Sequence, residues 1–232
     1  MGYKEINLNL GCPSGTVVAK GKGSGFLAYP EELDRFLDNI YSKLDMKISV
    51  KTRIGKTSPD EFHRLIEIYN KYPLEELIVH PRLQTDFYKN KPNLQIFKEA
   101  VEMSRHSLCY NGDIYTVEDF QKFSEHFPTV EKIMCGRGAV ANPSLFDAIA
   151  NGKKLDINTL KKFHDDIYMD YQEISSGERN VLFKMKELWS YLIQSFDHAE
   201  KYMKKIKKSE KLLAYEKAVS DLFANCPLKK GI

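Results

Sequence analysis

The chain contains no long apolar segment. Its longest apolar runs are of the kind seen at Leu77-Ile78-Val79, whereas a membrane-spanning helix needs about 20 apolar residues in succession. No basic segment followed by an apolar one opens the sequence, so a secretory leader is not indicated. With 42% apolar and 29% charged residues, the composition is that of an ordinary globular protein. We therefore expect a cytosolic (cytoplasmic) protein that does not associate with a membrane.

Cysteine is scarce, and the cysteines that occur are widely separated. The four cysteines form no C-x-x-C pair and stand at Cys12, Cys109, Cys135 and Cys226. Zinc sites and disulfide frameworks require closely and regularly spaced cysteines. Neither a metal site nor a set of disulfides is therefore predicted, and each cysteine has to be considered by itself.

Basic and acidic residues are nearly balanced in number except toward the C-terminal end, where basic residues are in excess. Residues 1–152 contain 19 Lys or Arg and 20 Asp or Glu, whereas residues 153–232 contain 16 and 12. A dense run consists of Lys201, Lys204, Lys205, Lys207, Lys208 and Lys211. On one helix all of them except Lys207 would share a broad face. Such a run is most often a solvated helix face, and it also suits a phosphate backbone.

Five short segments have the pattern of β-strands, and amphipathic helical patterns separate them. The strand-like segments are Glu5–Leu10, Lys47–Arg53, Glu76–His80, Ser107–Asn111 and Glu131–Cys135. Helix starts are indicated by Pro30, by a capping box from Ser58 to Glu61, and by Thr116. A chain that alternates strand and helix in this way forms a parallel sheet.

Two architectures repeat this unit, the open doubly wound sheet and the closed eight-stranded barrel. A closed barrel needs eight units and roughly 250 residues, whereas five units occupy about 150 residues here. If the sheet is a TIM-type (β/α) barrel, about three strands are absent at the N-terminus. Long helical patterns take over from Asp156, and residues 151–154 are the expected joint. We therefore predict an α/β fold with an incomplete barrel at residues 1–152 and an all-helical domain at residues 153–232.

The turn after the first strand carries Cys12 between Gly11 and Pro13. Both architectures place their active sites at the strand ends, so this thiol is exposed to a ligand at the mouth of the sheet. A lone cysteine near a turn is nevertheless more often inert than catalytic. The turn taken alone leaves both interpretations open.

The second strand alternates basic side chains, so that Lys51 and Arg53 point the same way. In a barrel this direction can be inward. An inward Lys51 needs an anionic or strongly polar partner, because burial of an unpaired charge is costly. The alternative is a solvent-facing basic pair on an edge strand.

The last three strands end in polar or glycine-bearing turns, namely His80-Pro81-Arg82, Asn111-Gly112-Asp113 and Gly136-Arg137-Gly138. Glycines let backbone N–H groups approach a phosphate closely, and Arg137 adds a bidentate donor. Each turn is weak when taken singly, and His80 by itself suits a structural hydrogen bond. Together the three turns favour a phosphorylated cofactor.

Five blocks of the sequence resemble the tRNA-dihydrouridine synthases in order and spacing. The blocks are Leu8-Asn9-Leu10-Gly11-Cys12-Pro13, Lys51-Thr52-Arg53-Ile54-Gly55, His80-Pro81-Arg82, Asn111-Gly112-Asp113-Ile114 and Gly136-Arg137-Gly138-Ala139. The similarity covers essentially residues 4–150, and five such blocks in series are highly specific. The helical part is similar to the family only loosely, through residues 184–192.

The resemblance implies a flavin site at the mouth of the barrel. FMN would lie there with Lys51 near the polar edge of its ring and His80 beside it. The residues that the resemblance assigns to the FMN phosphate are Asn111, Gly112, Asp113, Gly136 and Arg137.

The resemblance also implies the reaction, which is the reduction of uridine in tRNA to 5,6-dihydrouridine. Flavin reduced by NADPH would pass hydride to one carbon of the uracil double bond, and Cys12 would protonate the neighbouring carbon as general acid. Thiols suit this role because their ordinary pKa of about 8.5 leaves them mostly protonated at neutral pH. Asn9 would orient the uracil, and Lys20 and Arg82 would contact the RNA.

Departures from the family pattern leave other functions open. The family's N-terminal strands, which also contact FMN, are absent, so a missing N-terminal segment or a second chain would complete the barrel. Pro81 stands where the family commonly has glycine. One alternative is an FMN-dependent reductase or dehydrogenase of a free pyrimidine, against which the basic tail argues. The other is an inactive RNA-binding remnant, because a truncated barrel exposes unpaired strand edges.

Overall fold

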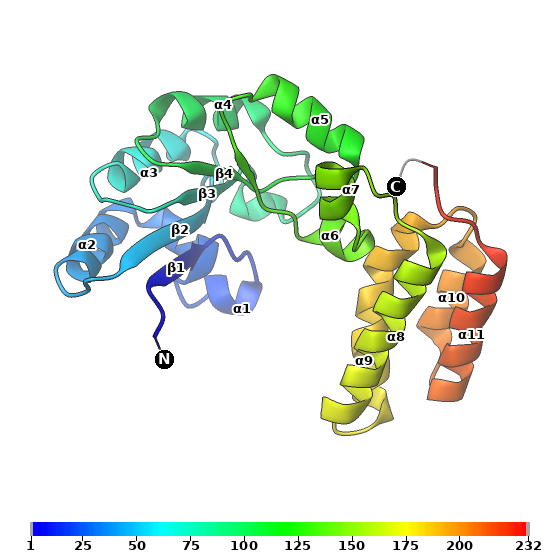
Figure 1. Ribbon diagram of the computed structural model, residues 1–232. Coiled ribbons are helices and arrows are strands. Elements are labelled where there is room, and N and C mark those ends of the chain that lie inside the picture. Colours follow the sequence, from blue (N-terminus) through cyan, green and yellow to red (C-terminus); the bar gives the residue numbers. More distant parts are fainter. Residues whose placement is uncertain (1, 231–232) are drawn as a thin grey trace. The chain divides into compact units, whose positions relative to one another are not determined.

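The computed structural model describes residues 2–230 and contains one parallel sheet of five strands (Figure 1). The strands are β1 (Glu5–Leu10), β2 (Lys47–Arg53), β3 (Leu77–His80), β4 (Leu108–Tyr110) and β5 (Lys132–Ile133). They lie side by side in chain order, each hydrogen-bonded to the next. The α/β class and the parallel sheet are therefore confirmed, and only the last three strands are shorter than expected.

One face of the sheet is apolar and is covered by helices. These are α2 (Pro30–Tyr41), α3 (Glu61–Tyr69) and α4 (Leu94–Met103), which lie on one side of the strands (Figure 1). Val50, Leu77 and Val79 are fully buried on this face. The hydroxyl of Tyr69 on α3 donates to Oγ1 of Thr52 at 3.0 Å. Removal of this apolar surface from water holds the helices on the sheet.

The opposite face of the sheet, called the polar face below, carries polar side chains together with the buried Ile78 and Cys109. The register of the strands aligns one row of side chains across it, from Asn9 through Lys51, Ile78 and Cys109 to Lys132. Arg53 pairs with His80 in the next row along the same face. Helices form the outer ring of a (β/α) barrel, so this polar face corresponds to the interior of such a barrel.

The sheet has two open edges within residues 2–230. Among these residues β1 pairs only with β2, and β5 pairs only with β4. Most side chains of β1 are exposed. The described residues therefore do not close a barrel by themselves, and its completion by further strands stays a prediction.

Side chains and backbone hydrogen bonds fix two of the predicted helix starts. The Glu61 carboxylate accepts from the backbone N–H groups of Lys56 and Ser58 at 2.6 and 2.9 Å. The other half of that capping box is not formed, because Ser58 Oγ accepts from the N–H of Asp60 instead. At α5 (Val117–His126) the box is complete, since Thr116 and Asp119 each accept from the backbone N–H of the other at 3.0 Å.

Packing divides the chain into two compact units. The first unit comprises Met1–Asp113 and Ser124–Met134, and the second comprises Ile114–Phe123 and Cys135–Ile232. Gly152 ends α7 (Leu145–Asn151) in a left-handed conformation, with φ of 71°. The second unit begins before this glycine, because α6 (Arg137–Ala141) packs against a later helix and the Ser195 hydroxyl donates to the Ala141 carbonyl at 2.6 Å. The functional division at residue 152 stays a prediction.

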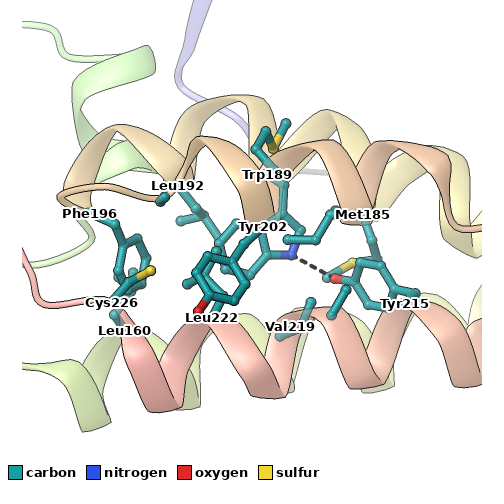
Figure 2. Packing of buried hydrophobic residues seen from close by; sticks show 14 of the residues in the cluster. Leu160, Met185, Trp189, Leu192, Phe196, Tyr202, Tyr215, Val219, Leu222 and Cys226 are labelled. Carbon is teal, nitrogen blue, oxygen red and sulfur yellow. Dashed lines mark hydrogen bonds between the residues drawn. The ribbon is translucent and has the colours of Figure 1, made fainter.

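Four long helices enclose the apolar core of the second unit. They are α8 (Ile157–Ile174), α9 (Glu178–Leu192), α10 (Glu200–Lys208) and α11 (Leu212–Asn225). Figure 2 shows Trp189, Met185 and Leu192 of α9 directed toward Tyr215 and Leu222 of α11, and all five are fully buried. The helical patterns predicted after Asp156 are thus present, and their apolar faces pack against one another.

The lysine-rich segment does not form one continuous helix. α10 ends at Lys208, the chain turns at Ser209, and Lys211 precedes α11 as its N-cap residue. The Ser209 hydroxyl donates to the Lys205 carbonyl at 2.9 Å and closes the last turn of α10. The prediction that Lys211 shares a helix face with Lys204 is therefore wrong.

The remaining elements are short. They are α1 (Gly15–Val18) and three 3₁₀ turns, η1 (Gly23–Ala28), η2 (Gln84–Asp86) and η3 (Ile193–Ser195). No helix between residues 2 and 230 is both long enough and apolar enough to cross a membrane. In the same part of the chain, no three His, Cys, Asp or Glu side chains gather as metal ligands would.

Candidate functional site

Cys12 lies on the turn between β1 and α1, and a second segment holds its backbone in place. The Cys12 carbonyl accepts hydrogen bonds from the backbone N–H and the hydroxyl of Ser24, at 3.0 and 2.8 Å. Gly23 approaches so closely that a Cβ there would lie 2.7 Å from the same carbonyl, and its φ is +56°. Only glycine adopts this conformation at this distance without strain. The thiol itself is partly exposed.

Lys51 lies beside this turn on the polar face of the sheet. Its Nζ atom would be 3.7 Å from a Cβ built on Gly11. Burial lowers the pKa of Lys51, and the charge of Arg53 lowers it further, whereas Cys109 and Cys12 act in the opposite direction. Within the described residues the ammonium group makes no hydrogen bond or ion pair. A largely desolvated cation without a partner provides a binding group for an anionic or strongly polar ligand.

Asn9 stands next to Lys51 in the register and shapes the same turn. Its side-chain oxygen accepts from the backbone N–H of Gly11 at 3.0 Å. The carboxamide nitrogen is exposed and makes no hydrogen bond within residues 2–230. Asn9 therefore combines a fixed orientation with an available donor.

Arg53 is fully buried and joins two of the turns that follow the strands. Nε donates to the Gly11 carbonyl at 3.0 Å, and the two terminal nitrogens donate to the carbonyls of Leu83 and Phe87 at 2.6 and 2.9 Å. Phe87 has a φ of +50°, which is unusual for a residue with a side chain. Arg53 thereby holds the Cys12 turn and the segment after β3 in a fixed relation.

His80 and Arg82 form a second buried network. Arg82 Nη1 lies 3.0 Å from His80 Nε2. Because guanidinium only donates, Nε2 is the acceptor and the ring hydrogen is on Nδ1. Arg82 also donates to both carboxylate oxygens of Asp113, at 3.0 and 2.5 Å, and to the Asn90 carbonyl at 2.6 Å.

This network bears on two predicted roles. Only 2% of Arg82 is exposed, so an RNA contact by this residue would require it to leave Asp113. Asp113 carries a negative charge that is compensated by Arg82, and a carboxylate without such compensation would repel a phosphate. Both assignments stay predictions, and the observed contacts favour a positioning role for the pair.

The turn after β4 is held by its own side chains. The Asn111 amide donates to the Met134 carbonyl at 2.7 Å and ties the end of β4 to the segment after β5. A Cβ on Gly112 would lie 2.0 Å from the hydroxyl oxygen of Tyr110. Gly112 is therefore required by packing, whatever its role toward a phosphate.

Gly136 and Arg137 belong to the second compact unit, where they begin α6. A Cβ on Gly136 would meet no atom within 4 Å, whereas one on Gly138 would lie 2.0 Å from the Ile114 carbonyl. Packing thus explains Gly138 and leaves open space at Gly136. The Arg137 guanidinium lies over the Tyr115 ring at 5.7 Å, so the ring positions this side chain.

Comparison with known proteins adds the family. The model of the family described as dihydrouridine synthase matches residues 1–229. The chain belongs to the dihydrouridine synthase family. This assignment accords with the resemblance in five blocks that the sequence shows, and the match extends through the helical part.

Several relatives of this dihydrouridine synthase family member carry the name probable tRNA-dihydrouridine synthase. The chain is 27% identical over 179 residues to probable tRNA-dihydrouridine synthase 2 of Bacillus subtilis strain 168, which covers 75% of this chain and 54% of the relative. It is 27% identical over 194 residues to one from Staphylococcus aureus strain MRSA252, covering 81% and 57%. For one from Staphylococcus epidermidis strain ATCC 12228 the identity is 31% over 154 residues, covering 63% and 46%. The chain thus spans about half the length of these relatives.

Two residues around the site of this family member, Ser24 and Tyr88, were not predicted from the sequence, and neither were the contacts of Arg53. Ser24 holds the Cys12 carbonyl, and Arg53 joins two turns. Tyr88 lies near the site after η2, with its ring 6.2 Å from that of His80 and 5.5 Å from the Arg53 guanidinium. The alternation of Lys51 and Arg53 indicated their shared face, whereas nothing in the sequence indicates which backbone carbonyls Arg53 binds. Lys20 is exposed on the turn after α1.

Proposed function

We propose that this chain takes part in the reduction of uridine to dihydrouridine in tRNA, with FMN as cofactor and NADPH as reductant. The observation that carries the proposal is the unpartnered, largely desolvated ammonium group of Lys51 beside the Cys12 turn. A globular protein gains nothing in stability from such a cation. Its presence on the polar face of the sheet is accounted for by a ligand that carries negative or polar atoms.

The residues of the site suit a flavin phosphate in their chemistry. Lys51 offers a cation toward polar ring atoms, and Gly136 leaves open space in which a phosphate could approach the backbone. Arg137 offers a guanidinium that binds phosphate in a bidentate manner. Bound FMN, once reduced by NADPH, would supply the hydride for one carbon of the uracil double bond. His80, Asn111, Gly112 and Asp113 are assigned to the same site, with Arg82 orienting His80 and Asp113.

The residues of the first turn account for the proton that the reduction also requires. Cys12 donates its thiol proton to the second carbon of the double bond and recovers a proton from solvent afterwards. Ser24 and Gly23 fix the backbone that carries the thiol. The exposed amide nitrogen of Asn9 donates to a carbonyl oxygen of the uracil, and Lys20 contacts the RNA backbone from an exposed turn.

An RNA-binding role without catalysis is the second candidate. It is favoured by the open sheet edges within residues 2–230, because five strands provide only part of a closed barrel and of a flavin site at its mouth. Reduction of a free pyrimidine is the third candidate.

A single set of assays distinguishes these candidates. The purified chain is incubated with FMN, NADPH and unmodified tRNA, and separately with free uridine, and dihydrouridine is measured by mass spectrometry. The proposal predicts bound flavin and product from tRNA only, with product lost and flavin retained in Cys12→Ala. Product from free uridine alone supports the pyrimidine reductase. RNA binding without flavin and without product supports the non-catalytic role and contradicts the proposal.

A further inference from the structure

A pocket of about 570 Å³ opens on the second compact unit between η3 and α10. Its volume lies within the range of about 300–1,000 Å³ that is usual for small-molecule sites. Its lining includes four apolar residues, called the floor below, namely Ile193, Phe196, Ala199 and Met203. Phe196 and Ala199 are each 3% exposed, so the floor is continuous with the core of this unit.

Three lysines line the same pocket, and they come from two distant parts of the chain. Lys204 and Lys207 lie one turn apart on α10, and Lys229 comes from the segment after α11. All three are exposed, and none makes a hydrogen bond or ion pair through its side chain within residues 2–230. By contrast, Lys205 lies 3.9 Å from Asp221. Because two carboxylates, those of Asp197 and Glu200, also line the pocket, the three lysines leave it an excess of one positive charge.

Backbone hydrogen bonds form one wall of this pocket before any ligand binds. The segment after α11 pairs with the segment after α9 through an antiparallel bridge between Phe196 and Leu228. The backbone N–H of Lys229 donates to the Ser195 carbonyl at 2.9 Å. These contacts fix the position at which Lys229 enters the pocket, which reduces the cost of ordering it on binding.

Two acids and a histidine complete the lining. Asp197 and Glu200 place carboxylates among the lysines, where they can accept hydrogen bonds from N–H groups of a ligand. His198 has a φ of +54°, a conformation that residues with side chains seldom adopt. Such backbone conformations occur preferentially where side chains are arranged for a ligand. A ligand that matches this lining combines an apolar part, N–H donors and negative charge.

We propose that this pocket binds a single unstacked nucleotide of the RNA substrate. The base lies on the apolar floor with its N–H groups toward Asp197 or Glu200, and the flanking phosphates contact Lys204, Lys207 and Lys229. Unstacked bases that stack on aromatic side chains are the usual targets of sequence-dependent RNA recognition, and the aromatic residues of this lining are Phe196 and the exposed His198. The proposal rests on the function proposed above, because that function makes RNA the partner of this unit.

The pocket also regroups the lysines of the tail. The sequence pattern set Lys207 apart from Lys204, yet both line one pocket. Lys201 and Lys205 lie over the ring of Tyr202 at 4.8 and 5.8 Å. If the lysines of α10 bound only the RNA backbone, each of them would contribute to RNA binding in a similar way through its charge. A nucleotide pocket instead depends on Lys204 and Lys207 in particular.

The test measures binding of labelled RNA to the full chain by fluorescence anisotropy. The probes are a single-stranded adenosine hexamer, a hexamer of the same phosphate number without bases, and a short RNA duplex. A base that rests on the floor predicts at least about fivefold tighter binding of the adenosine hexamer than of the abasic one, since one stacked base contributes about 1 kcal/mol or more. Equal binding of the two hexamers overturns the proposal and leaves a phosphate-only surface. Tighter binding of the duplex than of either hexamer also overturns it.

Matched variants assign the binding to the pocket. Lys204→Gln with Lys207→Gln flattens the salt dependence for the hexamer by roughly 1.4 units, about 0.7 for each lost phosphate contact. The control Lys205→Gln with Lys208→Gln removes the same charge from the same helix and leaves the preference for bases unchanged. Ala199→Leu fills the floor and abolishes that preference, with folding checked by circular dichroism. A preference that survives in a folded Ala199→Leu protein overturns the pocket assignment, and should this variant not fold, the comparison of hexamers in the natural protein decides.

These outcomes are separable from those of the proposed reaction. The binding assay involves no reduction, so loss of dihydrouridine formation leaves its results unaffected. Equal binding of the two hexamers, together with dihydrouridine formation on tRNA, refutes the pocket while the reaction stands.

Discussion

The guanidinium of Arg82 and the carboxylate of Asp113 form a two-point ion pair, with N–O distances of 3.0 and 2.5 Å. The arginine side chain is almost completely buried, whereas the aspartate side chain is 30% exposed. Loss of the carboxylate leaves a buried cation with one partner fewer. Asp113→Ala is expected to lower the free energy of unfolding by roughly 3 kcal/mol, near the lower end for broken buried pairs because Asp113 is partly exposed.

Urea unfolding measures this effect, and Asp113→Asn is the matched control. The amide keeps one acceptor for Arg82 and is expected to retain part of the stability. Equal stability of the natural protein and Asp113→Ala would show that the ion pair does not fix this turn.

Arg53 gives a second prediction, because three backbone carbonyls depend on it. Arg53→Lys keeps the charge but lacks the planar fork, and it leaves buried carbonyls unpaired at about 1–3 kcal/mol each. The expected loss in free energy of unfolding is roughly 3 kcal/mol. Arg64→Lys is the control, because Arg64 makes exposed ion pairs with Glu31 and Glu67 and its replacement should leave stability unchanged. If Arg53→Lys lowered the free energy of unfolding as little as Arg64→Lys, the role of Arg53 in joining the two turns would be refuted.

Lys51 gives a prediction in which stability and binding move in opposite directions. Lys51→Met removes a largely desolvated ammonium group that has no partner within residues 2–230. The free energy of unfolding should rise by about 1 kcal/mol, because the cost of desolvating the charge disappears. Retention of FMN, measured by absorbance after gel filtration, should fall in the same variant. A protein that loses stability with flavin retention unchanged would contradict the assignment of Lys51 to the ligand.

His164 provides a pH dependence in the helical unit. The Trp189 N–H donates to the Tyr215 oxygen at 2.9 Å, so the Tyr215 hydroxyl donates in turn to His164 Nε2 at 2.6 Å. Burial lowers the pKa of His164 below its ordinary value of 6.5, although Asp165 acts in the opposite direction.

The sign of the effect follows from proton uptake. The unfolded chain protonates first as the pH falls below about 6.5, so the free energy of unfolding decreases from that pH downward. Thermal unfolding between pH 7.5 and 5.5 should show this decrease in the natural protein and a smaller one in His164→Gln. Identical slopes in the two proteins would exclude His164 as the cause.

The sequence predicted those parts of the fold that a local residue pattern determines. The alternation of Lys51 and Arg53 predicted a shared face, and the register of β2 and β3 places both on the polar face. The buried contacts of Arg53 and Arg82 were not predictable, because their acceptors are carbonyls and a carboxylate on turns far along the chain.

The glycine and lysine patterns likewise did not predict the contacts of individual side chains. The sequence interpretation assigned Gly112 to phosphate binding. In the structure, the close approach of Gly112 to Tyr110 depends on how the Tyr110 ring packs. A helical wheel grouped Lys211 with Lys204 because it assumed a continuous helix, and the turn at Ser209 ends that helix. Local patterns thus indicate which elements form, whereas packing decides what each side chain meets.

Dihydrouridine in cellular tRNA tests the central claim most directly. The gene for this chain is deleted in its own organism, and each tRNA position is examined by mass spectrometry for the two hydrogens that distinguish dihydrouridine from uridine. The account predicts that at least one position loses dihydrouridine, that the natural gene restores it, and that a gene with Cys12→Ala does not. Unchanged dihydrouridine at every position after deletion, or full restoration by Cys12→Ala, would contradict it.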